Sequence, residues 1–436
     1  MSTRSLGIRL ARNWPVLALM VLIFLCIAAS LGDIRVAFDL NERERDFEVY
    51  YTAASMVYHH ETSLIYSGAD NGVDPQLRDA PKDSPIARRA ASAGIDRVQF
   101  YVYPPTLAYL LLPFALMPIW WATLVWKLLC ISALVATGLV LARLAGYPPL
   151  SRTGFAFCAF MLLFRPDLEC LFWGQATAIL ALILVAGLYL IERKRVALAT
   201  LLFALAFAVK LTPLITIIPL AVWREWKALR CFALWTAAIV IALWLPDRGQ
   251  LLGNYVEHVL PPMSVGAAVL TNKSLDSSMR LILLAVHCPL APKVVSYGSK
   301  FLSLFLIGLT AWRARSAPAG AGRGSPRLQW MTSFWLLSCC LSPVSWRHAY
   351  ALAAPAVIAL LTTSLQGKIE AGYYLLLLSF TLSVSSFGLD SFAKRGGALV
   401  TALDMLPPML GALLALTSGG GFDDAGFTSR NRSGCK

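Results

Sequence analysis

Long runs of apolar residues recur along most of this 436-residue chain. About 20 apolar residues in an α-helix span the hydrocarbon core of a bilayer. Because 58% of the residues are hydrophobic and only 14% are charged, an ordinary water-soluble globular domain is excluded. We therefore expect an all-α polytopic membrane protein. Its apolar runs lie at about 14–31, 119–142, 153–164, 172–191, 196–222, 230–246, 293–312, 329–346, 349–365, 371–388 and 397–416.

Basic residues between these runs predict the orientation of the chain. Loops rich in Lys and Arg stay on the cytoplasmic side of a bacterial plasma membrane. The run at 196–222 has basic clusters at both ends, so we expect a hairpin of two half-helices that Pro213 breaks. The total is then about 12 membrane helices with both termini cytoplasmic. The formal net charge of +14 thus follows from topology, and we expect no nucleic acid partner.

The spans are expected to form a single domain over 1–416, followed by a flexible cytoplasmic tail at 417–436. The largest extracytoplasmic loop, 32–103, carries twelve acidic and eight basic residues, a net charge of −4. Its aromatic and small residues favour short helices at the membrane surface. The stretch at 70–93 is rich in Asp, Arg, Pro and Ala, and we expect a polar loop insertion there.

Polar residues within spans or at their outer ends are the best candidates for function, because a bilayer penalises them elsewhere. Lys210 lies deep in an apolar run, and its natural partner is an anion such as a lipid phosphate. A single acidic residue of the first loop is more often merely solvated, and position alone does not separate Asp46 from Asp39. A lone histidine such as His348 is more often structural than catalytic. The other candidates are Tyr50, Tyr51, Gln175, Asn272, Lys273, Arg280, Trp346 and Arg347.

The motifs of soluble nucleotide-dependent enzymes are missing from the sequence. No GxGxxG, Walker, HExxH or EF-hand pattern occurs in a suitable context, and the nine cysteines show no CxxC spacing. We therefore expect neither a metal nor a cofactor. An enzyme that works on the outer face without cytosolic nucleotides needs an activated donor carried on a membrane lipid.

Several polar segments resemble, in order and spacing, the motifs of glycosyltransferase family 87. These are bacterial proteins of the polyprenyl-phosphate-mannose-dependent α-(1,2)-mannosyltransferase type, within the GT-C superfamily. The resemblance covers about residues 14–390. The matching segments are Asp46 with Tyr51–Ala54, Tyr103–Pro105 with Pro113, Gly174–Gln175, Lys210–Pro213, Asn272–Leu275 with Arg280, and Ser342–Trp346 with His348.

The resemblance implies a GT-C-type bundle and an enzyme that transfers a hexose, with mannose as the expected sugar. The donor would be a polyprenyl-phosphate sugar, and the acceptor a hydroxyl of a glycolipid or polysaccharide on the extracytoplasmic side. The reaction would be a metal-independent single displacement with inversion. Asp46 would be the base, with His348 orienting the acceptor or the base. The donor phosphate would lie at Lys210, Arg280 and Arg347, and the substrates at Tyr50, Tyr51, Gln175, Asn272, Lys273 and Trp346.

One departure from the family pattern affects the acceptor side. The family often has an acidic residue and paired histidines after the tryptophan, whereas here Arg347 and Ala349 flank a single His348.

A transporter or a flippase for lipid carriers is the main alternative, and it would show internal repeats and polar sites at the bilayer midplane. A scaffold protein with an inactive site is the third possibility.

Overall fold

The part of the chain that the computed structural model describes is mainly helical, in agreement with the all-α prediction. Among the residues that the structure describes, β-structure is limited to two isolated bridges, Asp79 with Gln99 and Asn272 with Trp346. The first apolar run and the C-terminal tail at 417–436 lie almost wholly outside the described residues. The structure describes residues 21, 24, 34, 37–39, 45–68, 79–265, 269, 272–285, 292–315, 326–364, 371–385 and 406–417.

Three of the described helices are long and apolar enough to cross a membrane. The other apolar helices are shorter, with 10–17 residues each. The structure therefore supports an all-helical membrane protein without establishing the predicted number of about 12 spans. The three long helices are α6 (Ile119–Leu144), α12 (Trp226–Trp244) and α16 (Pro292–Ala314).

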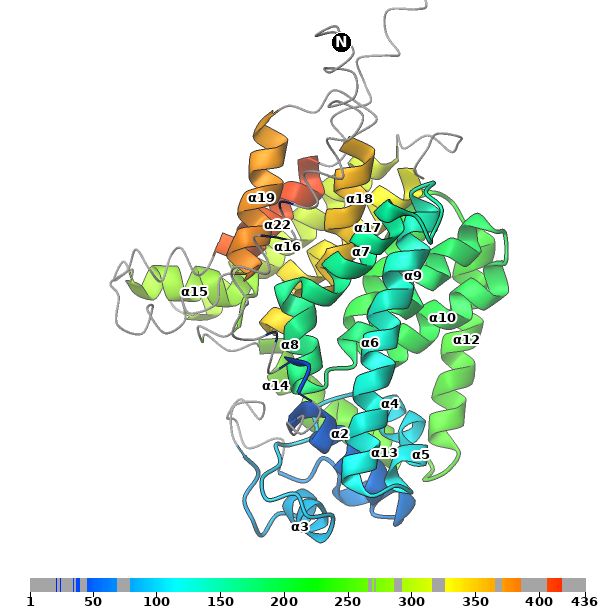
Figure 1. The fold of residues 1–436 in the computed structure, drawn as a ribbon. Helices are drawn as coiled ribbons and strands as arrows, with labels where there is room; N and C mark the ends of the chain where they lie inside the picture. Colours follow the sequence, from blue (N-terminus) through cyan, green and yellow to red (C-terminus); the bar gives the residue numbers. More distant parts are fainter. Residues whose placement is uncertain are drawn as a thin grey trace, which may run out of the picture.

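The bundle is built by helices that pack side by side (Figure 1). Helix α6 packs against α7 and α9, and α10 packs against α9 and α12. Gly138 permits close approach of α6 to α7, because a Cβ there would lie 2.7 Å from the Cys158 Cα. The bounds are α7 (Arg152–Leu163), α8 (Arg165–Trp173), α9 (Thr177–Glu192), α10 (Val196–Val209), α17 (Pro326–Leu341), α18 (Ala354–Ser364), α19 (Ala371–Ser385) and α22 (Leu406–Thr417).

The outer faces of α12 and α16 are apolar. Leu234 and Ile241 on α12, and Phe301 and Leu304 on α16, point away from the rest of the protein. Large apolar side chains exposed along whole helices need a partner other than water. The lipid tails of a bilayer supply such a partner, so these two faces are the lipid-facing sides of the bundle.

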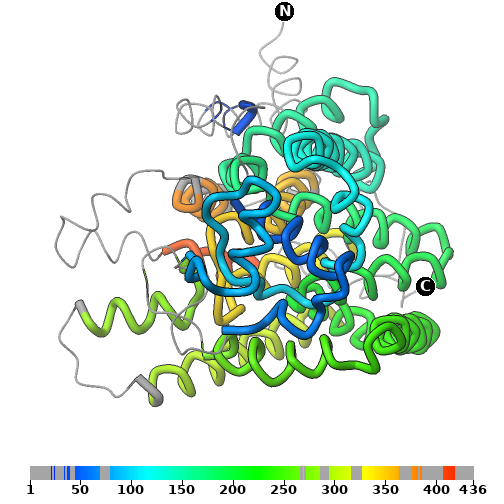
Figure 2. Tube along the Cα trace, turned by 90° about the horizontal axis from the view of Figure 1, so that it is seen from below, coloured from blue at the N-terminus to red at the C-terminus, as the bar shows by residue number. Residues whose placement is uncertain are grey.

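The helices of the first loop gather at one end of the bundle. They form the lower end in Figure 1, and Figure 2 shows α2 lying across the centre of that end. Part of the predicted insertion at 70–93 is helical, since it contains most of α3. Helix α3 packs on α2, with Ile86 buried, and Arg89 forms an ion pair with Glu61. The bounds are α2 (Arg45–Tyr58), η1 (Thr62–Leu64), α3 (Pro85–Ser92), α4 (Pro105–Leu110) and α5 (Leu112–Ala115).

The apolar run at 196–222 is not one continuous helix, as Pro213 predicts. Helix α10 ends at Val209, Lys210 is extended (φ −150°, ψ 135°), and a 3₁₀ turn and a short helix follow. The indole of Trp223 then donates to the Ala314 carbonyl at 3.2 Å, so the chain after the break reaches the end of α16. The two segments after Lys210 are η2 (Thr212–Thr216) and α11 (Ile217–Val222).

The remaining segments are short, and they lie in two places: α13 packs against η1 and α12 at the end formed by the first loop, whereas α15 and η4 lie beside α16 and α17. Helix α15 extends sideways from the bundle (Figure 1), and its polar residues lie in its N-terminal half. The 3₁₀ segment η4 follows α17 and packs against α8 and α9. The bounds are α13 (Gln250–Asn254), the π-helical η3 (Tyr255–Val259), α14 (Leu260–Val265), α15 (Leu275–Ala285) and η4 (Arg347–Ala353).

Candidate active site

Gln175 forms hydrogen bonds with three polar side chains from two distant segments of the chain. One of its two amide hydrogens goes to the Asp46 carboxylate and the other to the Tyr103 hydroxyl at 3.0 Å. Its carbonyl oxygen accepts from the Tyr50 hydroxyl at 3.1 Å. The primary amide thereby uses both donors and one acceptor position. The structure thus brings together Asp46, Tyr50 and Gln175, three of the predicted site residues.

The turn between α8 and α9 fixes the place of Gln175. Helix α8 ends at Gly174, whose φ of 69° is left-handed, a conformation that glycine adopts without a steric penalty. The Gln175 N–H then donates to the Cys170 carbonyl at 2.8 Å, and the Trp126 indole donates to the Gly174 carbonyl at 2.8 Å. The amide side chain therefore projects from a turn that is held on both sides.

Aromatic packing holds α2 against α6. The rings of Phe47 and Trp126 stack with centroids 5.2 Å apart. Tyr51 donates its hydroxyl to the Met117 carbonyl at 2.9 Å, so this side chain anchors α2 to the residues before α6. Its predicted contact with substrate remains a prediction, because its hydroxyl lies at Met117 and not at Gln175.

The Asp46 carboxyl lies on a helix outside the predicted spans and is a stronger base than an ordinary aspartate. Burial raises its pKa from 3.8 to about 6. The hydrogen bond from Gln175 and the charges of Lys210 and Arg45 lower the pKa and offset part of this rise. At neutral pH the carboxyl is ionised and can accept a proton.

Lys210 lies beside this cluster, at the break after α10. Its ammonium group donates to the Thr177 hydroxyl at 3.2 Å, and Thr177 is the first residue of α9. The charge acts on both Asp46 and His348, so the three groups lie within electrostatic reach of one another. The break therefore places a cation near the carboxylate of the first loop.

His348 is buried in η4, close to the turn that holds Gln175. Its backbone carbonyl accepts from the Cys170 thiol at 3.3 Å, which attaches η4 to α8. Lys210 lies close enough for its charge to act on the His348 ring. The role of His348 in orienting the acceptor or the base remains a prediction.

The two arginines predicted to bind phosphate are both paired with carboxylates. Arg347 contacts Glu169 at 2.9 Å, and Arg165 lies 3.6 Å from the same oxygen. Arg280 contacts Asp276 at 2.9 Å and donates to the Val265 carbonyl at 3.1 Å. Within the described part of the chain, the hydrogen-bond partner of Lys210 is instead a neutral hydroxyl.

Asn272 and Lys273 hold the loop that leads to His348. The Asn272 amide donates to the Pro343 carbonyl at 3.0 Å and accepts from the Ser345 N–H at 2.8 Å. The Lys273 N–H donates to the Ser345 carbonyl at 2.7 Å. Trp346 forms the isolated bridge with Asn272. These contacts position the loop, and the predicted contacts of the three residues with substrate are left as predictions.

Three residues that contact the predicted site residues were not themselves predicted as site residues. Tyr103 belongs to a motif that the sequence singles out, and Thr177 follows Gln175 by two positions. Glu169 gave no signal, because its pairing with Arg347 depends on tertiary packing. Among the residues that the structure describes, no three His, Cys, Asp or Glu side chains form a group that could hold a metal.

The arrangement suits transfer between a hydroxyl group and an anionic leaving group. A carboxylate with a pKa near 6 can take a proton from an attacking hydroxyl at neutral pH. A buried ammonium close by can stabilise the negative charge that develops on a departing phosphate.

Comparisons with known proteins point the same way. The sequence profile of glycosyltransferase family 87 matches residues 101–343, more than half of the chain. A curated relative from Mycolicibacterium smegmatis is 27% identical over 263 residues. It is a polyprenol-phosphate-mannose-dependent alpha-(1-2)-phosphatidylinositol pentamannoside mannosyltransferase. The aligned segment is 60% of this chain and 61% of the relative, less than two thirds of either protein.

Proposed function

This chain belongs to glycosyltransferase family 87, and from that premise we propose that it transfers a hexose from a polyprenyl-phosphate donor to an acceptor hydroxyl. The proposed sugar is mannose, because the curated relative depends on polyprenol-phosphate-mannose. The proposed acceptor is a glycolipid, since the relative is named for a phosphatidylinositol mannoside. The contact between Gln175 and Asp46 is the observation that carries the proposal, because it supports a role for the Asp46 carboxylate as the base.

The proposed reaction is a single displacement with inversion. The acceptor oxygen forms a bond to C1 of the sugar while the bond from C1 to the phosphate oxygen breaks. The acceptor proton goes to the Asp46 carboxylate, and the electron pair of the broken bond stays on the phosphate. Lys210 stabilises that phosphate, since its charge lies near Asp46 and its hydrogen-bond partner is the neutral Thr177.

The proposed location is a bacterial plasma membrane, with the site on the extracytoplasmic side and both termini cytoplasmic. The basic clusters between the apolar runs support this orientation. The first loop, which carries Asp46, lacks the excess of Lys and Arg over acidic residues that the cytoplasmic segments show.

The test uses the purified full-length protein in lipid vesicles. It is given polyprenyl-phosphate-mannose and a glycolipid extract, and labelled product is measured. Wild type is expected to transfer sugar and Asp46→Asn is not, because an amide cannot accept the proton. Full transfer by Asp46→Asn would remove Asp46 from the mechanism.

The matched control is Asp96→Asn, in the same loop and exposed to solvent. It loses the same charge without touching Gln175, so transfer at the wild-type rate is expected. No transfer by wild type with any polyprenyl-phosphate hexose would contradict the proposed function itself.

A further inference from the structure

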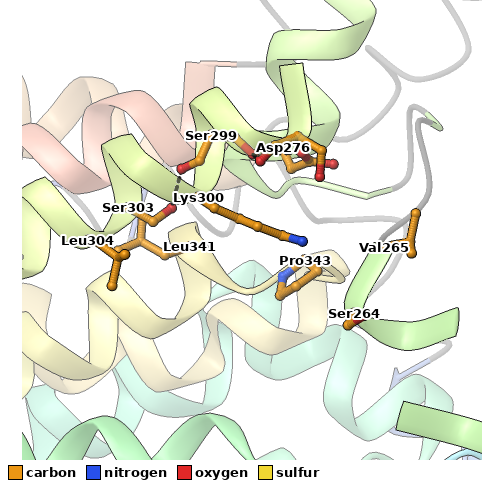
Figure 3. Close-up of a pocket in the computed structure, with 10 residues that line it drawn as sticks. Ser264, Val265, Asp276, Ser299, Lys300, Ser303, Leu304, Leu341 and Pro343 are labelled. Atoms are coloured by element: carbon orange, nitrogen blue, oxygen red, sulfur yellow. Dashed lines mark hydrogen bonds between the residues drawn. The ribbon is translucent and has the colours of Figure 1, made fainter. Parts of the chain in front are cut away.

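A cavity of about 330 Å³ lies between α14, α15, α16 and the end of α17 (Figure 3). These elements are distinct from those that supply Asp46, Gln175 and Lys210. The lining is rich in hydroxyl groups, which can donate to or accept from a polar ligand. The four serines in the lining are Ser264, Ser296, Ser299 and Ser303.

In the part of the chain that the structure describes, the charged groups around the cavity include one cation, Lys300, outside any ion pair. Asp276 lines the cavity, but its carboxylate is paired with Arg280 at 2.9 Å and accepts from the Ser299 hydroxyl at 2.6 Å. Lys300 extends its ammonium group across the cavity towards Pro343 (Figure 3). Among the described residues, Lys300 takes part in no ion pair. A ligand with a single negative charge would therefore match this site.

The cavity lies beside the lipid-facing side of the bundle. Leu304 lines it and is 69% exposed, and the neighbouring Phe301 is 74% exposed. Both belong to α16, a helix long enough to cross a membrane. Since that face is surrounded by lipid, a ligand can enter from the bilayer, and basic pockets between membrane helices commonly hold lipid headgroups.

The donor phosphate has a different place. For displacement at C1, the leaving phosphate must lie across the sugar from the base. In the proposed mechanism the base is Asp46, and Lys210, whose charge reaches Asp46, holds the phosphate. The cavity instead borders the loop before His348, because Pro343 lines it and accepts from Asn272 at 3.0 Å. We propose that the cavity binds the phosphodiester of an anionic glycerophospholipid, with Lys300 as the cation. Such a lipid carries one negative charge and reaches the site without leaving the membrane.

The experiment measures the affinity of the full-length protein in detergent for phosphatidylinositol by titration in native mass spectrometry. Lys300→Gln is expected to weaken binding about tenfold, because one charge-assisted contact is lost. Lys300→Arg is expected to bind as wild type. Ser296→Leu keeps every charge but fills the cavity, and it is expected to weaken binding to a similar degree. Lys227→Gln, at an exposed lysine of α12, is the matched control and leaves binding unchanged.

Two further arms identify the ligand. Phosphatidylcholine, whose headgroup is neutral overall, is expected to bind more weakly than phosphatidylinositol and to respond little to Lys300→Gln. Polyprenyl phosphate is expected to bind Lys300→Gln and wild type equally. If Lys300→Gln weakens polyprenyl phosphate instead of phosphatidylinositol, the cavity holds the donor carrier and the proposal is wrong.

The binding step is independent of the proposed glycosyl transfer. Asp46→Asn is expected to bind phosphatidylinositol like wild type, because Asp46 lies outside the cavity. A protein that binds the lipid through Lys300 but transfers no sugar would contradict the proposed function alone. Equal affinity of wild type, Lys300→Gln and Ser296→Leu for phosphatidylinositol would overturn the lipid site alone.

Discussion

Gln175 and Asp46, 129 positions apart in the sequence, are joined by a hydrogen bond from the amide of one to the carboxylate of the other. This bond favours the ionised carboxylate, whereas burial favours the protonated form. The two effects oppose each other, and burial dominates. The proton affinity of the proposed base is therefore adjusted by a neutral side chain.

The acid side of the pH profile should report this adjustment. Transfer by wild type is expected to fall as the pH drops through about 6, because a protonated Asp46 cannot accept a proton. Gln175→Leu removes a contact that lowers the Asp46 pKa, so its profile is expected to fall at a higher pH. The measurement is kcat/KM between about pH 5 and 8. Asp96→Asn should give the wild-type profile, and superimposable profiles for Gln175→Leu and wild type would contradict the assignment.

Stability should respond to Asp46 in the opposite direction from activity. The folded-state pKa is raised from 3.8 to about 6, so the stabilising contribution is present below about pH 4 and is lost as the pH rises through about 6. Asp46→Asn is therefore expected to melt at the same or a higher temperature than wild type at neutral pH. Thermal unfolding in detergent measures this. A large drop in Tm would show that the carboxylate is needed for folding.

Removing the charge of Lys210 should slow transfer strongly. Lys210→Gln is expected to lower kcat about 100- to 1,000-fold, the usual cost of losing one group that stabilises a developing anion. Lys210→Arg keeps the charge and is expected to retain part of the activity. Lys227→Gln serves as the control for general loss of a lysine. Wild-type kcat in Lys210→Gln would place the leaving phosphate elsewhere.

The pair of Arg347 and Glu169 should behave as a unit. Arg347→Gln leaves the partly buried carboxylate of Glu169 with only the longer contact to Arg165, and a loss of about 1–3 kcal/mol in stability is expected. The double variant with Glu169→Gln is expected to lose less stability than the sum of the two single losses, because the contact between the two side chains can be lost only once. Unfolding in detergent provides all four corners of the cycle. Additive losses would mean that the two side chains do not interact.

Close packing of α6 on α7 should show in a comparison of two glycines. Gly138→Ala places a Cβ 2.7 Å from the Cys158 backbone, so a loss of about 1–3 kcal/mol is expected. Gly308→Ala, inside α16, meets nothing within 4 Å and is expected to be neutral or slightly stabilising. Thermal unfolding distinguishes them. Equal Tm values would indicate that the two helices can separate without cost.

Local chemistry explains what the sequence could predict. Pro213 cannot continue a helix, so the break near Lys210 was predictable from the residues alone. The run at 172–191 was expected as one span, whereas Gly174 separates α8 from α9 and places Gln175 in the turn between them. A glycine is compatible with a helix contact or with a turn, and only packing decides between them.

Tertiary contacts explain which features of the site could not be predicted from the sequence. Burial beside Gln175 distinguishes Asp46 from Asp39, whose carbonyl accepts from Lys127 at 2.5 Å. Arg347 seemed available for phosphate because its partner Glu169 is 178 positions away. Arg280 is different, because Asp276 precedes it by four residues on one helix, a spacing at which such pairs form.

The base strength of Asp46 comes mainly from loss of water around the carboxyl, with charged neighbours contributing less. Dissolved salt screens charges that face water, over a Debye length of about 8 Å at physiological ionic strength. Dehydration is not screened in this way. The midpoint of the acid limb should therefore hardly move with ionic strength, so that an outward-facing enzyme would keep the same proton affinity in dilute and in saline surroundings.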